Sequence, residues 1–352
     1  MSVHPRSSAR RATLRDVART AGVSLKTASN VLNDSGRMTP QTRQRVQDAI
    51  EVLGYTVNSS ARSLASGTTH VLSLAVPTLR SPYLSQLAEA LIEVARGHGY
   101  ALQVTTYPEE GHGSRAHLAA VDPRVHDGTL LSMSEHHDLV PADLAVSHPL
   151  VCLGSRTTWG LVDRVTTDDV ANSAAATELL LATGASRLAV IGAHRQFRSA
   201  AVAVEGNAEL RLRGIEQACE ARGVALEPAL VGVTGFDWTI GTGFRSMEAL
   251  IAQGRTFDAV VGLNDALAIG AISALRAHGL DVPGDVQVVG FDNIDESAYL
   301  SPPLTSVDSN IGWIAETAVV RLIARINGST EPARTFRRTS AIIERGTTRP
   351  RR

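Results

Sequence analysis

Residues 13–33, with the sequence TLRDVARTAGVSLKTASNVLN, predict two short helices joined by a glycine turn near the N-terminus. Thr13 is placed to cap the first helix, because Asp16 follows three residues later as in a capping box. Gly22 accepts the left-handed conformation that a tight helix exit needs, and Ser24 is placed to cap the second helix. This arrangement indicates a helix-turn-helix unit.

The second helix has an apolar inner face, formed by Ala28, Val31 and Leu32, and a polar outer face. A short polar face held over a first helix is what the major groove of DNA admits. The alternative is an ordinary helical hairpin whose polar face meets water. The candidate DNA contacts in this unit are Thr13, Ser24, Leu25, Lys26, Thr27, Ser29 and Asn30.

Three of these side chains have donors, acceptors or apolar groups that match base edges. Lys26, the only lysine in the chain, can donate to guanine but can equally pair with a phosphate. Asn30 can donate to and accept from adenine, and Leu25 can pack on a thymine methyl group.

A third helix and the distribution of charge support a nucleic-acid-binding head. Thr39 and Pro40 are typical of a helix start and Gly54 of a helix end, so this helix covers about residues 40–53. Residues 1–70 carry ten basic and four acidic side chains, whereas the whole chain has a net charge of −1. A basic head on an acidic body suits a DNA-binding module attached to a sensor. A basic disordered arm would not need the apolar periodicity.

The N-terminal motifs extend beyond the first two helices. The run LRDVARTAGVSLKTASNVLN is followed by RQRV at residues 43–46, LGY at 53–55 and NSSARSL at 58–64. Together they resemble the head of the lactose-repressor/galactose-repressor family of bacterial transcription regulators. In that family the last of these motifs is a hinge: a short helix that forms on operator DNA.

The resemblance implies a role for the hinge residues Asn58, Arg62 and Leu64 in DNA binding. Leu64 takes the position of a leucine that enters the minor groove at the dimer axis, where an apolar wedge can kink the duplex. By composition alone, residues 58–67 would be a plain linker rich in Ser and Ala. Asn30 departs from the family, in which a larger basic residue is common, so the resemblance leaves open which operator bases are read.

The body of the chain alternates short apolar runs of strand type with amphipathic helical stretches. This alternation predicts an α/β fold with two doubly wound parallel-sheet lobes. Strands are expected at residues 71–76, 101–105, 128–131, 150–153, 188–191, 229–233, 259–262 and 286–291. Helices are expected at residues 83–98, 210–222, 243–253, 266–278 and 310–326. The family shares this architecture with periplasmic sugar-binding proteins.

The expected organisation has three parts. A helix-turn-helix domain covers residues 1–57, a hinge covers 58–69, and an effector-binding and dimerisation core covers 70–352. Within the core, we expect a first lobe at about 70–167 and 308–330, and a second lobe at about 168–307 and 331–352. The tail after Arg345 has no leucine heptad, so a tetramer built by a C-terminal coiled coil is not expected. We expect a dimer, because operator half-sites related by a two-fold axis need a two-fold protein.

A ligand of this fold binds between the lobes, near the carboxyl ends of the strands. Asn264 and Asp292 each follow a predicted strand, but both could instead cap helices. Arg211 stands where the family has a ligand-clamping arginine, and Trp238 offers a platform for a pyranose ring or is simply core. The candidate effector contacts are Tyr83, Arg156, Arg211, Trp238, Asn264 and Asp292. As a set they favour a sugar or sugar derivative.

Other chemistry is sparse in this sequence. It has no Walker motif or full dinucleotide fingerprint, so we expect no cofactor, and residues 136–138, HHD, are not expected to form a metal site. Cys152 and Cys219 suit a reducing cytoplasm. There is no signal peptide and no run of about 18 apolar residues, so a solute-binding protein is disfavoured and no membrane partner is expected. An enzyme would need a nucleophile or a paired acid and base near Asp292, and we find none.

Overall fold

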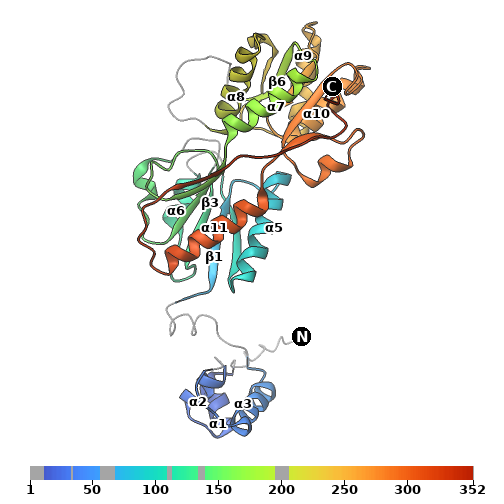
Figure 1. The fold of residues 1–352 in the computed structure, drawn as a ribbon. Coiled ribbons are helices and arrows are strands. Elements are labelled where there is room, and N and C mark those ends of the chain that lie inside the picture. The colour runs from blue at the N-terminus through green and yellow to red at the C-terminus, as the bar shows by residue number, and fades with distance from the viewer. Residues whose placement is uncertain are drawn as a thin grey trace, which may run out of the picture. The chain divides into compact units, whose positions relative to one another are not determined.

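The computed structural model describes residues 12–32, 35–55, 68–108, 113–133, 139–194 and 206–351. The chain divides into two compact units, Met1–Thr69 and His70–Arg352. They are described separately below (Figure 1).

The first unit contains three short helices around one small core. They are α1 (Leu14–Ala21), α2 (Leu25–Leu32) and α3 (Pro40–Leu53). The core is made of the small and β-branched side chains Val17, Ala18, Ala21, Ala28, Val31, Val46 and Ala49. These positions follow the helical spacing of the sequence, so Ala28 and Val31 are confirmed on the inner face of α2. Leu32, also expected there, is half-buried and lies outside this core cluster.

The predicted helix caps are present. Thr13 Oγ1 accepts from the backbone N–H of Asp16 at 3.4 Å, and Asp16 Oδ2 accepts from the N–H of Thr13 at 3.0 Å. Ser24 Oγ accepts from the N–H of Thr27 at 3.0 Å. Gly22 and Gly54 end α1 and α3 with φ of 63° and 55°, which a residue with a Cβ adopts only with strain.

The second unit contains two six-stranded sheets, each forming a lobe. The first sheet is entirely parallel, in the order β11-β5-β4-β3-β1-β2. Its strands are β1 (Val71–Val76), β2 (Ala101–Thr106), β3 (Gly128–Ser132), β4 (Leu150–Leu153), β5 (Asp163–Thr167) and β11 (Thr335–Arg338). Its helices are α5 (Pro82–Gly97), α6 (Gly113–Ala120), the 3-10 turn η1 (Pro141–Leu144) and α11 (Ile311–Ile326).

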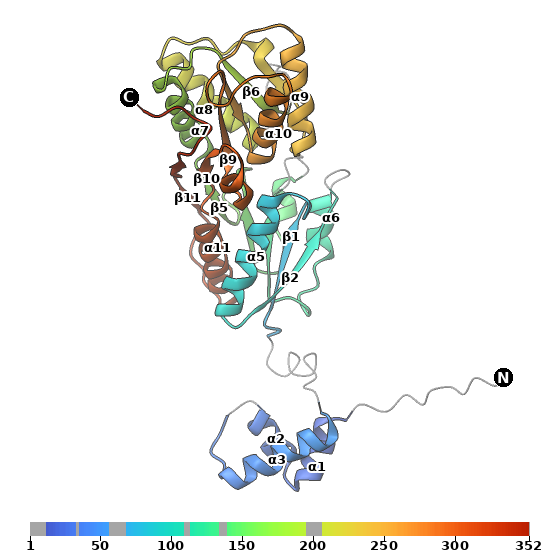
Figure 2. The ribbon, with the colours of Figure 1, turned by 90° about the vertical axis from the view of Figure 1, so that its right-hand side faces the viewer.

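Side chains that alternate along β1 point to opposite faces of the first sheet and pack into two different cores. Leu72 and Leu74 of β1 pack with α5 and α11, which lie side by side on one face (Figures 1 and 2). Ala75, the residue after Leu74, points to the other face and packs there with Leu118 of α6. A strand buried on both faces needs apolar residues at odd and even positions, which explains the mostly apolar sequences of β1 and β4.

The second sheet has the order β12-β10-β9-β8-β6-β7, and only the β10–β12 pair is antiparallel. Its strands are β6 (Leu188–Ala193), β7 (Val231–Val233), β8 (Ala259–Gly262), β9 (Gln287–Asp292), β10 (Thr305–Asp308) and β12 (Ile342–Ile343). Its helices are α7 (Asp169–Ala182), α8 (Asn207–Ala221), α9 (Ile240–Ala252), α10 (Asp265–Ala277) and the 3-10 turns η2 (Pro228–Leu230) and η3 (Asp295–Tyr299).

The lobes differ from the sequence-based expectation in the place of one strand and in several elements that were not expected. Residues 335–338, expected in the second lobe, form β11 and pair with β5 in the first sheet. The strands β5 and β10 and the helices α6 and α7 were not expected. The polar sequence DRVTT gives β5 little apolar pattern, and its place is set by backbone pairing with β4 and β11.

The chain crosses between the lobes three times, and one serine joins the three crossings. Ser340 follows β11, Asn310 precedes α11, and Asn172 lies in the first turn of α7. Ser340 Oγ accepts from Asn172 Nδ2 and from Asn310 Nδ2, both at 3.0 Å. The N–H of Ser340 also donates to Asn172 Oδ1 at 2.9 Å. These bonds fix the crossings to one another.

Candidate functional site

The outer face of α2 presents its first two residues to solvent. The Leu25 side chain is 44% exposed although it is apolar, and Lys26 is exposed beside it. Ser29 and Asn30 are half-buried. The face predicted to contact DNA is therefore open at its N-terminal end, where recognition helices contact base edges.

Two of the candidate DNA contacts also hold the helix start together. Ser24 Oγ and Thr27 Oγ1 lie 2.8 Å apart at the beginning of α2. Thr13 is similarly engaged with Asp16 at the beginning of α1, where its hydroxyl donates to Asp16 Oδ2 at 2.7 Å. These hydroxyls have a capping role whatever else they contact.

Asn30 is close to the connection between α2 and α3. A Cβ added to Gly36 would lie 3.1 Å from Asn30 Nδ2, and Gly36 has φ of 83°. The Asn30 carbonyl also accepts from the N–H of Ser35 at 2.9 Å. Asn30 thus packs against this connection, a contact that the helical pattern did not indicate.

Several predicted residues lie outside the described part of the chain. They are the hinge residues Asn58, Arg62 and Leu64 and the histidine-rich residues 136–138.

In the second unit, a buried arginine is the centre of a polar network beside the strand ends of the second sheet. Arg211 of α8 is 7% exposed, and its Nε donates to Asp169 Oδ1 at 2.7 Å. Its Nη1 donates to the carbonyl of Leu263. The guanidinium also lies over the ring of Phe291, 4.6 Å from its centre, and 5.8 Å from that of Trp238. These contacts fix the plane of the guanidinium.

Asp292 faces this arginine from the end of β9. Its Oδ1 lies 3.9 Å from Arg211 Nη2, and the residue has φ of 101°. Burial raises the pKa of Asp292 to about 8, against the opposing charge of Arg211 and with help from Asp265 and Asp169. Such a carboxyl is held partly protonated near neutral pH, so it can donate as well as accept hydrogen bonds.

Tyr83, at the start of α5, brings the first lobe to the same place. Burial raises the pKa of its hydroxyl, the charges of Asp292 and Asp169 raise it further, and Arg211 opposes them. A tyrosine of one lobe is thus within electrostatic reach of the arginine and carboxylates of the other.

Asn264 and Trp238 have the structural roles that the sequence left open. Asn264 Oδ1 accepts from the N–H of Leu267 at 2.8 Å and caps α10, while its Nδ2 donates to the Trp238 carbonyl at 3.3 Å. Trp238 is half-buried against the second-lobe core, and its Nε1 donates to the Gly192 carbonyl at 3.0 Å. Its ring remains next to Arg211.

Arg156 and Ser155 follow β4 in the first lobe. Arg156 is 8% exposed, and its carbonyl accepts from Arg164 Nη1 at 2.6 Å. Ser155 Oγ donates to Asp169 Oδ2, so it connects the first lobe to the carboxylate that holds Arg211.

Sequence reasoning missed Asp169 and Ser155. Asp169 follows the unpredicted strand β5, and a carboxylate after a strand is the signal that could have identified it.

A second buried carboxylate lies behind Asp292. Asp265, at the start of α10, accepts from Ser306 Oγ at 2.6 Å, Ser297 Oγ at 2.7 Å and the N–H of Ile294 at 3.0 Å. Burial raises its pKa to about 6, although these hydrogen bonds oppose the shift. Asp265 therefore joins η3 and β10 to α10 and supports the segment that carries Asp292.

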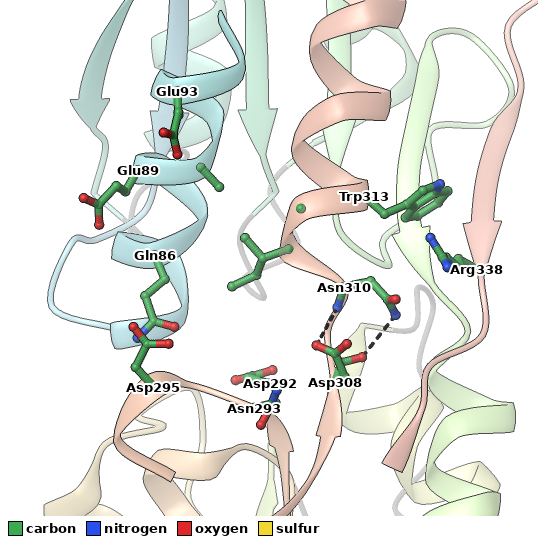
Figure 3. A pocket seen from close by; sticks show the side chains of 13 residues that line it. Gln86, Glu89, Glu93, Asp292, Asn293, Asp295, Asp308, Asn310, Trp313 and Arg338 are labelled. Carbon is green, nitrogen blue, oxygen red and sulfur yellow. Dashed lines mark hydrogen bonds between the residues drawn. The ribbon is translucent and has the colours of Figure 1, made fainter. Parts of the chain in front are cut away.

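A cavity of about 570 Å³ opens beside Asp292, between the two lobes. Figure 3 shows Gln86, Glu89 and Glu93 of α5 on one side and Trp313 and Arg338 on the other. Of the six candidate effector residues, Asp292 is the one that lines this cavity; the sequence had pointed to none of its other lining residues. The lining contains five acidic residues and one arginine, so this opening is more acidic than the network around Arg211.

Comparisons with known proteins agree with both units. The sequence model described as "Bacterial regulatory proteins, lacI family" matches residues 13–58, and one described as "Periplasmic binding protein-like domain" matches residues 177–348. The HTH-type transcriptional repressor PurR of Pasteurella multocida is 31% identical over 327 residues, covering 91% of this chain and 93% of the relative. The chain belongs to the lacI family.

Solved structures of family members have the same fold. A LacI-type transcription regulator from Bifidobacterium animalis subsp. lactis is 34% identical, with a TM-score of 0.74, and the match covers 80% of this chain and 100% of that one. A complex of the transcriptional regulator CelR with cellobiose is 26% identical, with a TM-score of 0.70 and coverage of 96% and 100%.

This lacI-family chain is a DNA-binding transcriptional regulator, and its curated relatives are transcriptional repressors and regulators, not enzymes. None of the helices in the described part of the chain has the length and apolar content needed to cross a bilayer. Within the same residues, no three His, Cys, Asp or Glu side chains are grouped so that they could hold a metal ion.

Proposed function

We propose that the protein represses transcription in the cytoplasm by binding a pseudo-palindromic operator as a homodimer, under the control of a small sugar-like effector held between its lobes. The observation that carries the effector part of this proposal is the buried pair Arg211–Asp292, with Tyr83 of the other lobe within electrostatic reach.

The head supports the operator part through Leu25 and Lys26, which are exposed at the start of α2. An apolar and a basic side chain next to each other suit a thymine methyl group and a guanine or phosphate. Ser29, Asn30 and the hinge residues Asn58, Arg62 and Leu64 extend the proposed interface. Two such heads on one dimer would read two half-sites.

The effector chemistry follows from the groups that meet at Arg211. Its Nε donates to Asp169, its Nη1 donates to the Leu263 carbonyl, and its Nη2 lies 3.9 Å from Asp292 Oδ1. A donor beside a partly protonated carboxyl matches a hydroxyl, which both donates and accepts. The ring of Trp238 would stack on the apolar face of a pyranose. Tyr83, Arg156 and Asn264 complete the proposed site, and the CelR complex contains cellobiose.

The experiment is a gel shift of the full-length protein on the intergenic DNA upstream of its own gene, with and without a panel of mono- and disaccharides. Sequence-dependent binding that one sugar releases or strengthens supports both parts of the proposal. Specific binding that no sugar alters contradicts the effector part. Absence of specific binding contradicts the operator part.

A matched pair of variants assigns the response to the cleft. Arg211→Lys keeps the charge but loses the guanidinium fork, and we expect it to bind operator DNA while losing the sugar response. Arg276→Lys makes the same change on the exposed face of α10 and should respond like the unaltered protein. An unchanged sugar response in Arg211→Lys would exclude the proposed contact.

A further inference from the structure

A side chain of the third helix, α3, donates a hydrogen bond to the turn between α1 and α2. Arg45 of α3 donates from Nη2 to the carbonyl of Gly22 at 3.1 Å, across 23 positions of sequence. A Cβ added to Gly22 would still lie 3.8 Å from this nitrogen. The guanidinium therefore sits on the turn itself, which links the two helices of the helix-turn-helix unit.

The carbonyl of Gly22 lies at a place where a cation is favourable. Gly22 ends α1, and its N–H donates to the carbonyls of Ala18 and Arg19. The carboxyl end of a helix carries partial negative charge and carbonyls that lack partners within the helix. An arginine there contributes both a hydrogen bond and a favourable charge interaction.

The position of Arg45 is fixed by its neighbour. Val46 is fully buried in the head core, so the backbone that carries Arg45 is anchored to α1 and α2. On the other side of the turn, Ser24 caps α2 two residues after Gly22. The bond from Arg45 thus acts on the segment that sets the direction in which α2 leaves the turn.

We propose that Arg45 is a positioning residue for DNA recognition, whose guanidinium fixes the α1–α2 turn and thereby the orientation of α2, and which does not neutralise a DNA phosphate. The inference rests on the proposed function, because α2 is taken as the helix that meets DNA. It differs from the usual role of an exposed arginine in a basic head, which is to contact the DNA backbone.

Arg45→Met tests this role, because it keeps a long apolar stem and removes the charge and the donors. Lys26→Met is the matched control, since Lys26 is exposed on α2 and its loss removes a proposed DNA contact without touching the turn. Both variants are made in the full-length protein. Circular dichroism verifies that each is folded at the temperature of the binding measurements.

Three quantities are measured for each variant. The first is the slope of log affinity against log salt on a random-sequence duplex, to which each phosphate contact contributes about 0.9. The second is hydrogen exchange of the backbone amides over residues 22–28, and the third is the preference for the upstream intergenic DNA over a scrambled duplex. For Arg45→Met we expect an unchanged slope, faster exchange and a preference reduced about tenfold, the size of one lost base-pair discrimination.

For Lys26→Met we expect unchanged exchange, with either a smaller slope or a smaller preference. A fall of about one in the slope of Arg45→Met, whatever its exchange rate, would identify a phosphate contact and overturn the proposal. Unchanged exchange and preference in Arg45→Met would overturn it as well. If the unaltered protein shows no salt-dependent DNA binding, the proposed function itself fails, which is a different result from a changed slope in the variant alone.

Discussion

Arg211 Nε and Asp169 Oδ1 are 2.7 Å apart, and both side chains are less than a tenth exposed. Asp169 also accepts from Ser155 in the loop after β4. One carboxylate thus connects the arginine of the second lobe to a serine of the first. Because removing one partner of a buried pair leaves the other charge uncompensated, this connection is sensitive to single substitutions.

Asp169→Asn should lower the free energy of unfolding by about 3 kcal/mol, because Arg211 would keep its buried charge and lose the carboxylate that accepts from its Nε. The check is urea unfolding followed by circular dichroism. Glu178→Gln on the same helix is the control: its bond to Arg222 is on the surface, so we expect a loss of less than about 1 kcal/mol. Equal losses in the two variants would contradict the importance of the buried pair.

The pH dependence of stability should change when Asp292 is replaced by Asn. Its pKa is raised by burial from 3.8 to about 8, so the folded state retains a proton that the unfolded state releases earlier. The resulting stabilisation is fully present below pH 3.8 and is lost progressively as pH rises to about 8. The unfolding free energy of the unaltered protein minus that of Asp292→Asn, whose amide imitates the protonated carboxyl, should therefore fall with rising pH over this interval. A difference that grows or stays constant would show that Asp292 is ionised throughout.

Asp265→Ala should destabilise the second lobe by about 3 kcal/mol, because it leaves three buried donors without their acceptor. The matched change is Asp281→Ala, whose carboxylate accepts from the Gly284 N–H in an exposed turn. Thermal unfolding of both variants measures the effect. A loss no larger than that of the exposed variant would mean that water replaces the missing carboxylate.

Ser340→Ala should loosen the attachment of the three lobe crossings, because it removes the hydroxyl that accepts from Asn172 and Asn310. We expect a loss of about 1–2 kcal/mol in unfolding free energy, the size of two amide–hydroxyl bonds. Hydrogen exchange over residues 308–312 and 338–342 should also increase, while exchange in β1 stays the same. Ser301→Ala, at an exposed position, serves as the reference.

Local features could be predicted directly from the amino-acid sequence. The caps at Thr13 and Ser24, the left-handed glycines and the inner-face positions Ala28 and Val31 depend on neighbours within about four residues, and all are confirmed. Strands with continuous apolar runs, such as β1 and β8, were also located correctly. The polar strand β5 was missed, because its pairing partners lie elsewhere in the sequence.

The sequence by itself determined the helix-turn-helix head, the alternation of strands and helices, and the family, since short-range periodicity and motifs encode them. Only the tertiary structure decided that β11 joins the first sheet, that Asp169 engages Arg211, and that Arg45 reaches Gly22. Each of these depends on groups far apart in the chain, whose backbone pairing, hydrogen bonds and charges act only once packing has brought them within reach.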